Sequence, residues 1–185
     1  MTDLRLFLQH APAEEFRGSV HRLCISLYRN RTLSMSGARD CGARYNIRNY
    51  FGALYTALDL ATARAEMRRY FTVEPDCGLV EAVIDLELTR VVDLTKHSAL
   101  RRLGVRSVDL TGERYAVCQE FGLRAWECGL EGLLVPSAAA RGRKNLVVFL
   151  DNQQPAWSVR LRSVAAADLL ITGHALPGLR RSGSN

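Results

Sequence analysis

The stretch CGARYNIRNYFGALYTALDLATARAEM, residues 41–67, joins a glycine-bearing turn to a short strand and a helix. The segment GALYTA, residues 52–57, predicts the strand, and Asp59 follows where a helix N-cap is expected. The apolar residues after it recur at the spacing of one helical face, at Leu60, Ala63, Met67 and Phe71. A strand followed at once by a helix of about three turns is therefore expected here.

Three polar side chains are evenly spaced along this stretch: Arg44, Tyr55 and Glu66. Glu66 lies about 100° from Met67 around the predicted helix, at the edge of the apolar stripe, where a carboxylate can face a cleft. A cation, a phenol and a carboxylate suit a ligand that carries phosphate, a flat ring and a breakable bond. Taken singly, each is also an ordinary residue of a strand core or a helix surface.

Outward from this stretch, strands outnumber helices. LVEAVIDLEL, residues 79–88, alternates apolar with polar residues and predicts a half-buried strand. Residues 28–49 are polar and lack periodicity, so a long loop is expected. Further strands are expected at residues 19–27, 91–95, 131–136, 145–150 and 157–163. Helices are expected at 98–104, where Gly104 ends the helix, and at 112–129, where Gly122 weakens its middle. The last six residues, RRSGSN at 180–185, are expected to form a mobile tail.

This order of elements favours an α+β fold with a mixed or antiparallel sheet over a doubly wound fold. A chain of 185 residues predicts one domain over residues 1–185, and a hydrophobic fraction of 48% is enough for a buried core. The net charge of +6 and the pI near 9.4 favour a phosphate-bearing or acidic partner.

The five cysteines predict neither disulfides nor a metal site. They are odd in number, contain no C-x-x-C pair and follow no secretory leader at residues 1–10, so reduced thiols in a cytoplasmic protein are expected. The histidines are scattered, which argues against structural zinc. No apolar run approaches the roughly 20 residues that span a membrane. Cys41 lacks a patterned histidine partner and is not favoured as a nucleophile.

Several familiar site motifs are missing. The sequence contains no G-x-G-x-x-G, so a dinucleotide would not be held in the Rossmann manner. It also contains no G-x-x-x-x-G-K-[ST] and no G-x-S-x-G, so NTPase and α/β-hydrolase functions lose their main support.

Arginine is concentrated in the first quarter of the chain, at Arg22, Arg29, Arg31, Arg39, Arg44 and Arg48. A solvated basic face is one interpretation. A phosphate clamp is the other, because guanidinium pairs with phosphate oxygens through two parallel hydrogen bonds. Arg22 favours the clamp, since it lies inside an otherwise apolar strand and a charge there needs a partner.

Four segments together resemble the RES domain: Arg22 in a first strand, GARYN at residues 42–46, LYTALDLATARAEM at 54–67 and GLLVPSA at 132–138. This family is named for its arginine, glutamate and serine and is found as the toxin half of bacterial toxin–antitoxin pairs. The resemblance spans residues 20–150, the expected core, and leaves a C-terminal strand and tail at 151–185.

The resemblance implies a fold similar to that of ADP-ribosyltransferases, a single compact α+β domain with a split sheet around an NAD cleft. It implies a toxin that degrades NAD+, most simply by phosphorolysis to nicotinamide and ADP-ribose 1″-phosphate. NAD+ is then the substrate, inorganic phosphate the co-substrate, and no cofactor is permanently bound. A cognate antitoxin, often with a helix-turn-helix DNA-binding part, would cover the cleft entrance.

The resemblance also implies roles for six residues. Glu66 and Arg44 are the expected catalytic residues, with Glu66 stabilising the ribose cation. The residues expected to bind the dinucleotide are Arg22, Arg44, Tyr55, Glu66, Ser137 and Asn145, with the arginines on the anionic groups, Tyr55 on the ring or ribose and Ser137 at the nicotinamide end.

The sequence departs from the family pattern in two places. The usual Gly-Gly-Arg-Trp becomes Gly42-Ala43-Arg44-Tyr45, and the region 72–129 is long, so its helices are expected to cover the cleft or to meet a partner differently.

Transfer of ADP-ribose to a protein and plain hydrolysis of NAD+ remain alternatives that product analysis separates. A non-enzymatic nucleic-acid-binding module is a further alternative, recognisable by steep salt dependence. Direct nucleic-acid binding is not expected, because the aromatic residues form no regular stacking series among the arginines.

Overall fold

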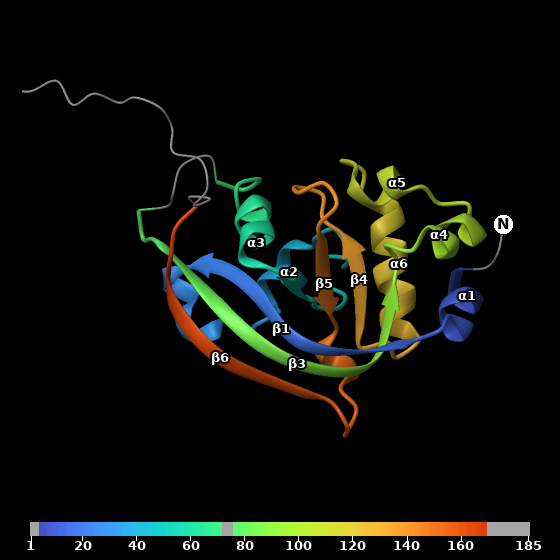
Figure 1. Cartoon of the computed structure of the whole chain (residues 1–185), viewed down its shortest axis with the longest axis horizontal. Coiled ribbons are helices and arrows are strands. Elements are labelled where there is room, and N and C mark those ends of the chain that lie inside the picture. Colours follow the sequence, from blue (N-terminus) through green and yellow to red (C-terminus); the bar gives the residue numbers. More distant parts are fainter. Residues whose placement is uncertain (1–3, 72–75, 170–185) are drawn as a thin grey trace, which may run out of the picture.

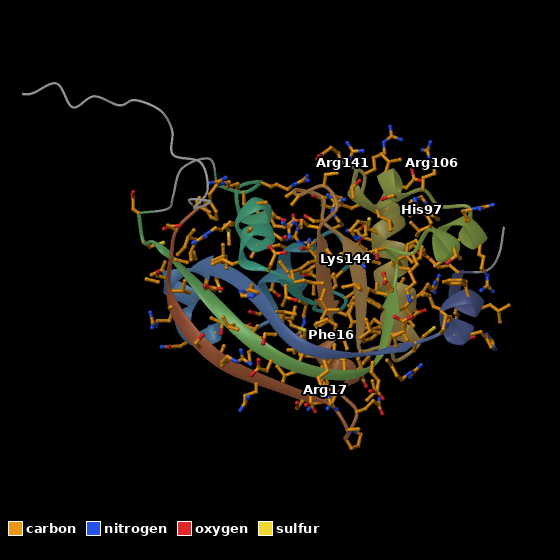
Figure 2. All side chains as sticks on the ribbon, viewed as in Figure 1. Phe16, Arg17, His97, Arg106, Arg141 and Lys144 are labelled. Carbon is orange, nitrogen blue, oxygen red and sulfur yellow. The ribbon has the colours of Figure 1, made fainter. Side chains whose placement is uncertain are left out.

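Two long antiparallel strands, β1 (Glu14–Ile25) and β3 (Leu79–Asp93), run side by side across the molecule in the computed structural model, which describes residues 4–71 and 76–169 (Figure 1). The predicted alternation in β3 is confirmed, because the residues of its apolar face are buried: Val80, Ala82, Ile84, Leu86 and Leu88. In β1, Phe16 packs against the core while its neighbour Arg17 is exposed (Figure 2). Strand β1 begins five residues before the predicted strand at 19–27 and ends two residues before it, and β3 joins the strands predicted at 79–88 and 91–95 into one.

The strands form one mixed sheet in the order β1-β2-β5-β4-β3-β6, and the pairing of β1 with β3 closes the first five into a ring. The remaining strands are β2 (Leu54–Ala57), β4 (Gly132–Pro136), β5 (Lys144–Val148) and β6 (Ser158–Ala167). Among the strands of the described residues, only β3 and β4 pair in parallel. The mixed sheet was predicted correctly. A closed ring replaces the expected split, although β1 and β2 are joined only at His21 and Ala57.

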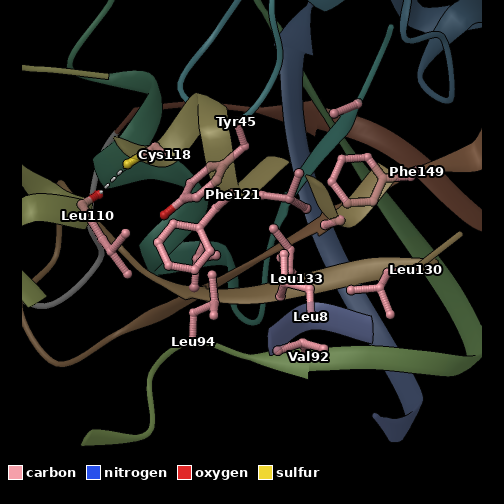
Figure 3. Packing of buried hydrophobic residues seen from close by; sticks show 14 of the residues in the cluster. Leu8, Tyr45, Val92, Leu94, Leu110, Cys118, Phe121, Leu130, Leu133 and Phe149 are labelled. Atoms are coloured by element: carbon pink, nitrogen blue, oxygen red, sulfur yellow. Dashed lines mark hydrogen bonds between the residues drawn. The ribbon is translucent and has the colours of Figure 1, made fainter. Parts of the chain in front are cut away.

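Strand β5 is buried on both faces of the sheet. Leu146 and Val148 of β5 pack inside the ring with Val20 and Ile84. Val147, between them, packs on the outer face in a second cluster that includes Phe121, Leu133 and Phe149 (Figure 3). A strand buried on both faces reads as a continuous apolar run, as NLVVFL does.

Helices cover the outer face in two groups (Figure 1). The second cluster draws residues from α1 (Leu4–His10), α4 (His97–Leu103), α5 (Ser107–Thr111) and α6 (Ala116–Glu127). α3 (Leu60–Met67) lies apart from them and packs Ala63 on Leu23 and Ala57. The short segments α2 (Ser36–Cys41), η1 (Ser26–Arg31) and η2 (Leu150–Asn152) complete the fold.

Several predicted elements need correction. The expected loop at residues 28–49 contains part of η1 and all of α2, and α1 and α5 were not predicted. The helix expected to reach Phe71 ends at Met67, because Arg69 and Tyr70 donate to carbonyls three residues back and tighten the turn. Gly104 does end α4, with a left-handed φ of 67°. The tail RRSGSN lies outside the described residues.

Three findings bear on chemistry. All five cysteines are free thiols. Across residues 4–71 and 76–169, no cluster of three or more histidine, cysteine or acidic side chains is arranged to hold a metal ion. In the same ranges, every helix is too short or too polar to cross a bilayer.

Candidate functional site

A cavity of about 240 Å³ opens where β1 and β2 separate beside α3. Its walls come from β1, β2, α3, the ends of β4 and β5, and the turn at residues 43–45. Five of the six predicted site residues line it: Arg22, Arg44, Tyr55, Glu66 and Asn145.

Glu66 is fixed through a single carboxylate oxygen. Oε1 accepts hydrogen bonds from Ser137 Oγ (2.6 Å) and Asn145 Nδ2 (2.7 Å). It also accepts from the backbone N–H groups of Ala138 (3.1 Å) and Ala139 (3.4 Å). No described residue donates to Oε2, so one oxygen holds the side chain in place and the other is left for a ligand.

The helix that carries Glu66 is positioned by its predicted N-cap. Asp59 Oδ1 accepts from the backbone N–H of Thr62 at 2.8 Å, as expected for a cap that satisfies a free helical N–H group. Arg69, at the other end, donates to the carbonyl of Ala138 at 3.0 Å. The cap fixes where α3 begins, and Arg69 ties the end of the helix to the β4–β5 turn.

Ser137 supports Glu66 from outside the cavity. Its side chain is buried, and Oγ donates to Glu66 while accepting from the backbone N–H groups of Ala139 (3.2 Å) and Ala140 (2.9 Å). Ser137 does not line the cavity wall. Its contact with the cavity is therefore indirect, through Glu66.

Arg22 presents an unpaired charge to the cavity. Its Nη1 atom is buried and has no hydrogen-bond partner, and no described acidic side chain forms an ion pair with it. Burial lowers the pKa of the Arg22 guanidinium, and the nearby Cys24 thiol offsets this effect only in part. The sequence predicts a partner for the charge of Arg22, and no acidic side chain in the described part of the chain supplies it.

Arg44 is held at the cavity wall from three directions. Its Nη1 donates to the carbonyls of Gly112 (2.6 Å) and Leu110 (3.2 Å), and its guanidinium lies 4.4 Å from the centre of the Tyr115 ring. Both hydrogen bonds use Nη1, and the side chain of Cys118 also lies close to the guanidinium.

The hydroxyl of Tyr55 is already occupied. It donates to Asn46 Oδ1 (2.9 Å) and accepts from the backbone N–H of Tyr45 (2.8 Å). Burial raises the pKa of Tyr55 well above its usual range, so the phenol stays protonated. The ring, which lines the cavity, is the part that a ligand can contact.

Several residues that build the site were not predicted from the sequence. Asn46 is fully buried; its Nδ2 donates to the carbonyls of Ala38 and Phe51, and its Oδ1 accepts a hydrogen bond from the Tyr55 hydroxyl. Its position in the GARYN segment, two residues after Arg44, is the sequence feature that could have identified Asn46 as a site residue. Tyr70, four residues after Glu66 in the turn that follows α3, also lines the cavity, and this spacing from Glu66 could have identified it. His21 also lines it and contacts Glu81 at 2.6 Å.

The long region after β3 supports the turn that carries Arg44. Gln119 of α6 donates to the carbonyl of Ala43 at 3.2 Å. A Cβ on Gly122 would lie 1.8 Å from the carbonyl oxygen of Tyr45, so only glycine lets α6 approach this closely. Gly122, which the sequence marked as a weak point in the helix, is therefore required by packing.

The fold and the site define a closed α+β domain whose cavity combines two guanidinium groups with one fixed carboxylate. A family model described as the RES domain matches residues 19–170, and the chain belongs to this family.

Individual relatives agree with this assignment. The NAD(+) phosphorylases MbcT of Mycobacterium tuberculosis (strain ATCC 25618 / H37Rv) and of Mycobacterium bovis are each 32% identical to this chain over 117 residues. The match covers 60% of this chain and 63% of the length of these relatives. A crystal structure of the M. tuberculosis MbcT–MbcA toxin–antitoxin complex contains a chain with the same fold, at a TM-score of 0.74 and 24% identity, with 90% of this chain and 92% of that chain covered.

Proposed function

We propose that this protein is the toxin of a toxin–antitoxin pair and that it degrades NAD+ by cleaving the bond between nicotinamide and ribose. The observation that carries the proposal is the fixed carboxylate of Glu66 in a cavity that also holds Arg22 and Arg44. Membership of the RES family and similarity to the NAD(+) phosphorylase MbcT support the same conclusion. In this proposal the fold is ADP-ribosyltransferase-like and the cavity is the NAD cleft.

The chemistry needs a negative charge more than it needs an acid. As the bond breaks, positive charge develops on the ribose, as in the transition states of glycosidases. Nicotinamide is cationic before it leaves and neutral afterwards, so its departure requires no proton. A carboxylate held in place before the reaction stabilises the ribose cation without reorganisation. Glu66 Oε2 is the atom proposed for this role.

The two arginines are proposed to bind anions. Arg22, whose buried Nη1 has no partner in the described chain, would pair with the pyrophosphate or with incoming phosphate. Arg44, fixed by α5 and Tyr115, would hold the pyrophosphate nearer the surface. Tyr55 would place its ring against the nicotinamide or the ribose.

The size of the cavity suggests how the dinucleotide is divided. Pockets that enclose drug-sized ligands run from about 300 to 1,000 Å³, and this cavity holds about 240 Å³. We therefore place the nicotinamide riboside end inside and the adenosine end along the mouth, near the exposed side chain of Tyr70. Figure 2 shows further basic side chains, Arg106 and Arg141, on the side of α5 and the β4–β5 turn.

Inorganic phosphate is the proposed acceptor, which gives ADP-ribose 1″-phosphate, and no permanently bound cofactor is required. Transfer of ADP-ribose to a protein and plain hydrolysis use the same cavity and differ only in what attacks the ribose. A cytoplasmic enzyme of this kind must be restrained, so we propose a cognate antitoxin, with a helix-turn-helix DNA-binding part, that covers the cavity entrance.

The test is to incubate the purified protein with NAD+, with and without phosphate, and to identify the products by mass spectrometry. We expect nicotinamide and ADP-ribose 1″-phosphate, formed only when phosphate is present. Free ADP-ribose formed at a rate independent of phosphate would replace phosphorolysis by hydrolysis. A mass increase on an added protein would replace it by transfer, and intact NAD+ under all conditions would refute the proposal.

A further inference from the structure

The side-chain amide of Asn145 is held in one orientation. Its Nδ2 donates to Glu66 Oε1 at 2.7 Å. An asparagine amide has one acceptor oxygen and one donor nitrogen, and turning it over would set its oxygen against a carboxylate oxygen that already accepts three other hydrogen bonds. Glu66 therefore fixes which end of the amide is Oδ1.

The Oδ1 atom of Asn145 lacks a partner. It is buried, and no described residue donates a hydrogen bond to it. Buried amide oxygens are normally satisfied, so an orphaned acceptor in a cavity wall calls for an explanation. Oδ1 can only accept, so the group that satisfies it must carry an N–H or O–H donor.

The surroundings of Asn145 suit the flat ring proposed for this cavity. In the sheet, Asn145 is paired with Ala57 on one side and Val135 on the other, and all three line the cavity. Ala57 is small and Val135 is apolar, so a planar ring has space there and meets no competing polar group from either cross-strand neighbour. The Tyr55 ring belongs to the same wall.

We infer that Asn145 Oδ1 accepts a hydrogen bond from the carboxamide N–H of the ring that is released, so that the site selects a dinucleotide bearing a carboxamide over one bearing a carboxylate. This inference rests on the proposed function. A ring carboxylate offers no donor to Oδ1, and its charge would meet the carboxylate of Glu66 nearby. Asn145 thus determines specificity in addition to positioning Glu66.

The experiment compares NAD+ with nicotinic acid adenine dinucleotide, which differs from NAD+ only in this group. Wild-type kcat/KM should favour NAD+ by about 100-fold or more, because a site built around a hydrogen bond rejects the analogue that lacks the donor. In Asn145→Ala and Asn145→Ser the ratio should fall to about tenfold or less. Circular dichroism checks that each variant is folded.

Ser137→Ala is the matched control, because it also removes a donor to Glu66 but lies outside the cavity wall. It should slow both substrates and leave the ratio as in the wild type. A ratio unchanged in both Asn145 variants, or equal use of the two dinucleotides by the wild type, would overturn the inference and leave the proposed function standing. If the wild-type protein consumed neither dinucleotide, both the inference and the proposed function would be overturned.

Discussion

At the scale of single residues, the site depends on side chains that are distant in sequence and meet at one oxygen atom. α3 supplies Glu66, the β4–β5 turn supplies Ser137 and two backbone N–H groups, and β5 supplies Asn145. Four donors on Oε1 set the direction of the carboxylate, and a carboxylate directed in advance stabilises a developing cation more effectively than a mobile one. Within the described residues, no group donates a hydrogen bond to Oε2.

Arg44→Ala should weaken substrate binding. Arg44 lines the cavity and donates to the carbonyls of Leu110 and Gly112, so the variant loses the proposed anion contact and a support of α5. We expect the KM for NAD+ to rise about tenfold or more, which is the effect of losing roughly 1.4 kcal/mol of binding. The melting temperature should also fall.

Arg39→Ala serves as the control for charge alone. Arg39 is exposed on α2 and does not line the cavity, so its removal lowers the net charge by the same amount as Arg44→Ala. Steady-state kinetics should leave its KM within about twofold of the wild type, because surface charges far from a site are screened. Equal KM values for the Arg44 and Arg39 variants would remove Arg44 from the binding site.

At the scale of elements, α5 and α6 hold the turn that carries Arg44. Carbonyls at the end of α5 receive the guanidinium, Gln119 of α6 binds the carbonyl of Ala43, and Gly122 packs on the backbone of Tyr45. The turn itself contains little regular structure, apart from one bridge between Ala43 and Asn46. The helices that follow β3 are therefore part of the site's support.

Gly122→Ala should destabilise the protein, although the same change in an open helix stabilises it. The new Cβ would lie 1.8 Å from the carbonyl oxygen of Tyr45, a backbone atom that cannot move freely. Overpacking of this kind costs about 1–3 kcal/mol, against a gain of about 1 kcal/mol in helix propensity. Urea unfolding should show a lower free energy of unfolding, and KM should rise as Arg44 shifts.

Gly37→Ala tests the opposite case on α2. A Cβ at Gly37 would have no atom within 4 Å, and the backbone there does not require glycine. The free energy of unfolding should therefore hold or rise by up to about 1 kcal/mol. If both variants were equally stable, the close contact between α6 and the turn would not limit stability.

At the scale of the whole molecule, closure of the sheet separates the buried cluster inside the ring from the cluster on its outer face. The cavity lies where the strands of the ring share the fewest paired residues. β1 and β2 share one residue pair, and beside that pair the sheet contributes wall residues from four strands (Figure 1). The opening is covered on one side by α3. The position of the cavity therefore follows from strand pairing that is incomplete at a single place.

Much of this was predictable from the sequence, for local reasons. The alternation in β3, the N-cap at Asp59 and the stop at Gly104 are signals carried by neighbouring residues, and the structure confirms all three. Closure of the ring was not predictable, because it depends on the pairing of β1 with both β2 and β3, which are far apart in sequence. The requirement for Gly122 was missed for the same reason, since its partner Tyr45 lies in a distant segment.

The central claim is that the negative charge of Glu66 drives the cleavage of NAD+. The most direct test is the rate of nicotinamide release by Glu66→Gln, which keeps a side chain of the same size with an acceptor oxygen but removes the charge. The control is Glu87→Ala, which removes an exposed carboxylate on the outside of β3. Both variant proteins should remain folded. We expect kcat to fall by about 100- to 1,000-fold in Glu66→Gln and to stay unchanged in Glu87→Ala. Nicotinamide release by Glu66→Gln within a few-fold of the wild-type rate would contradict the account.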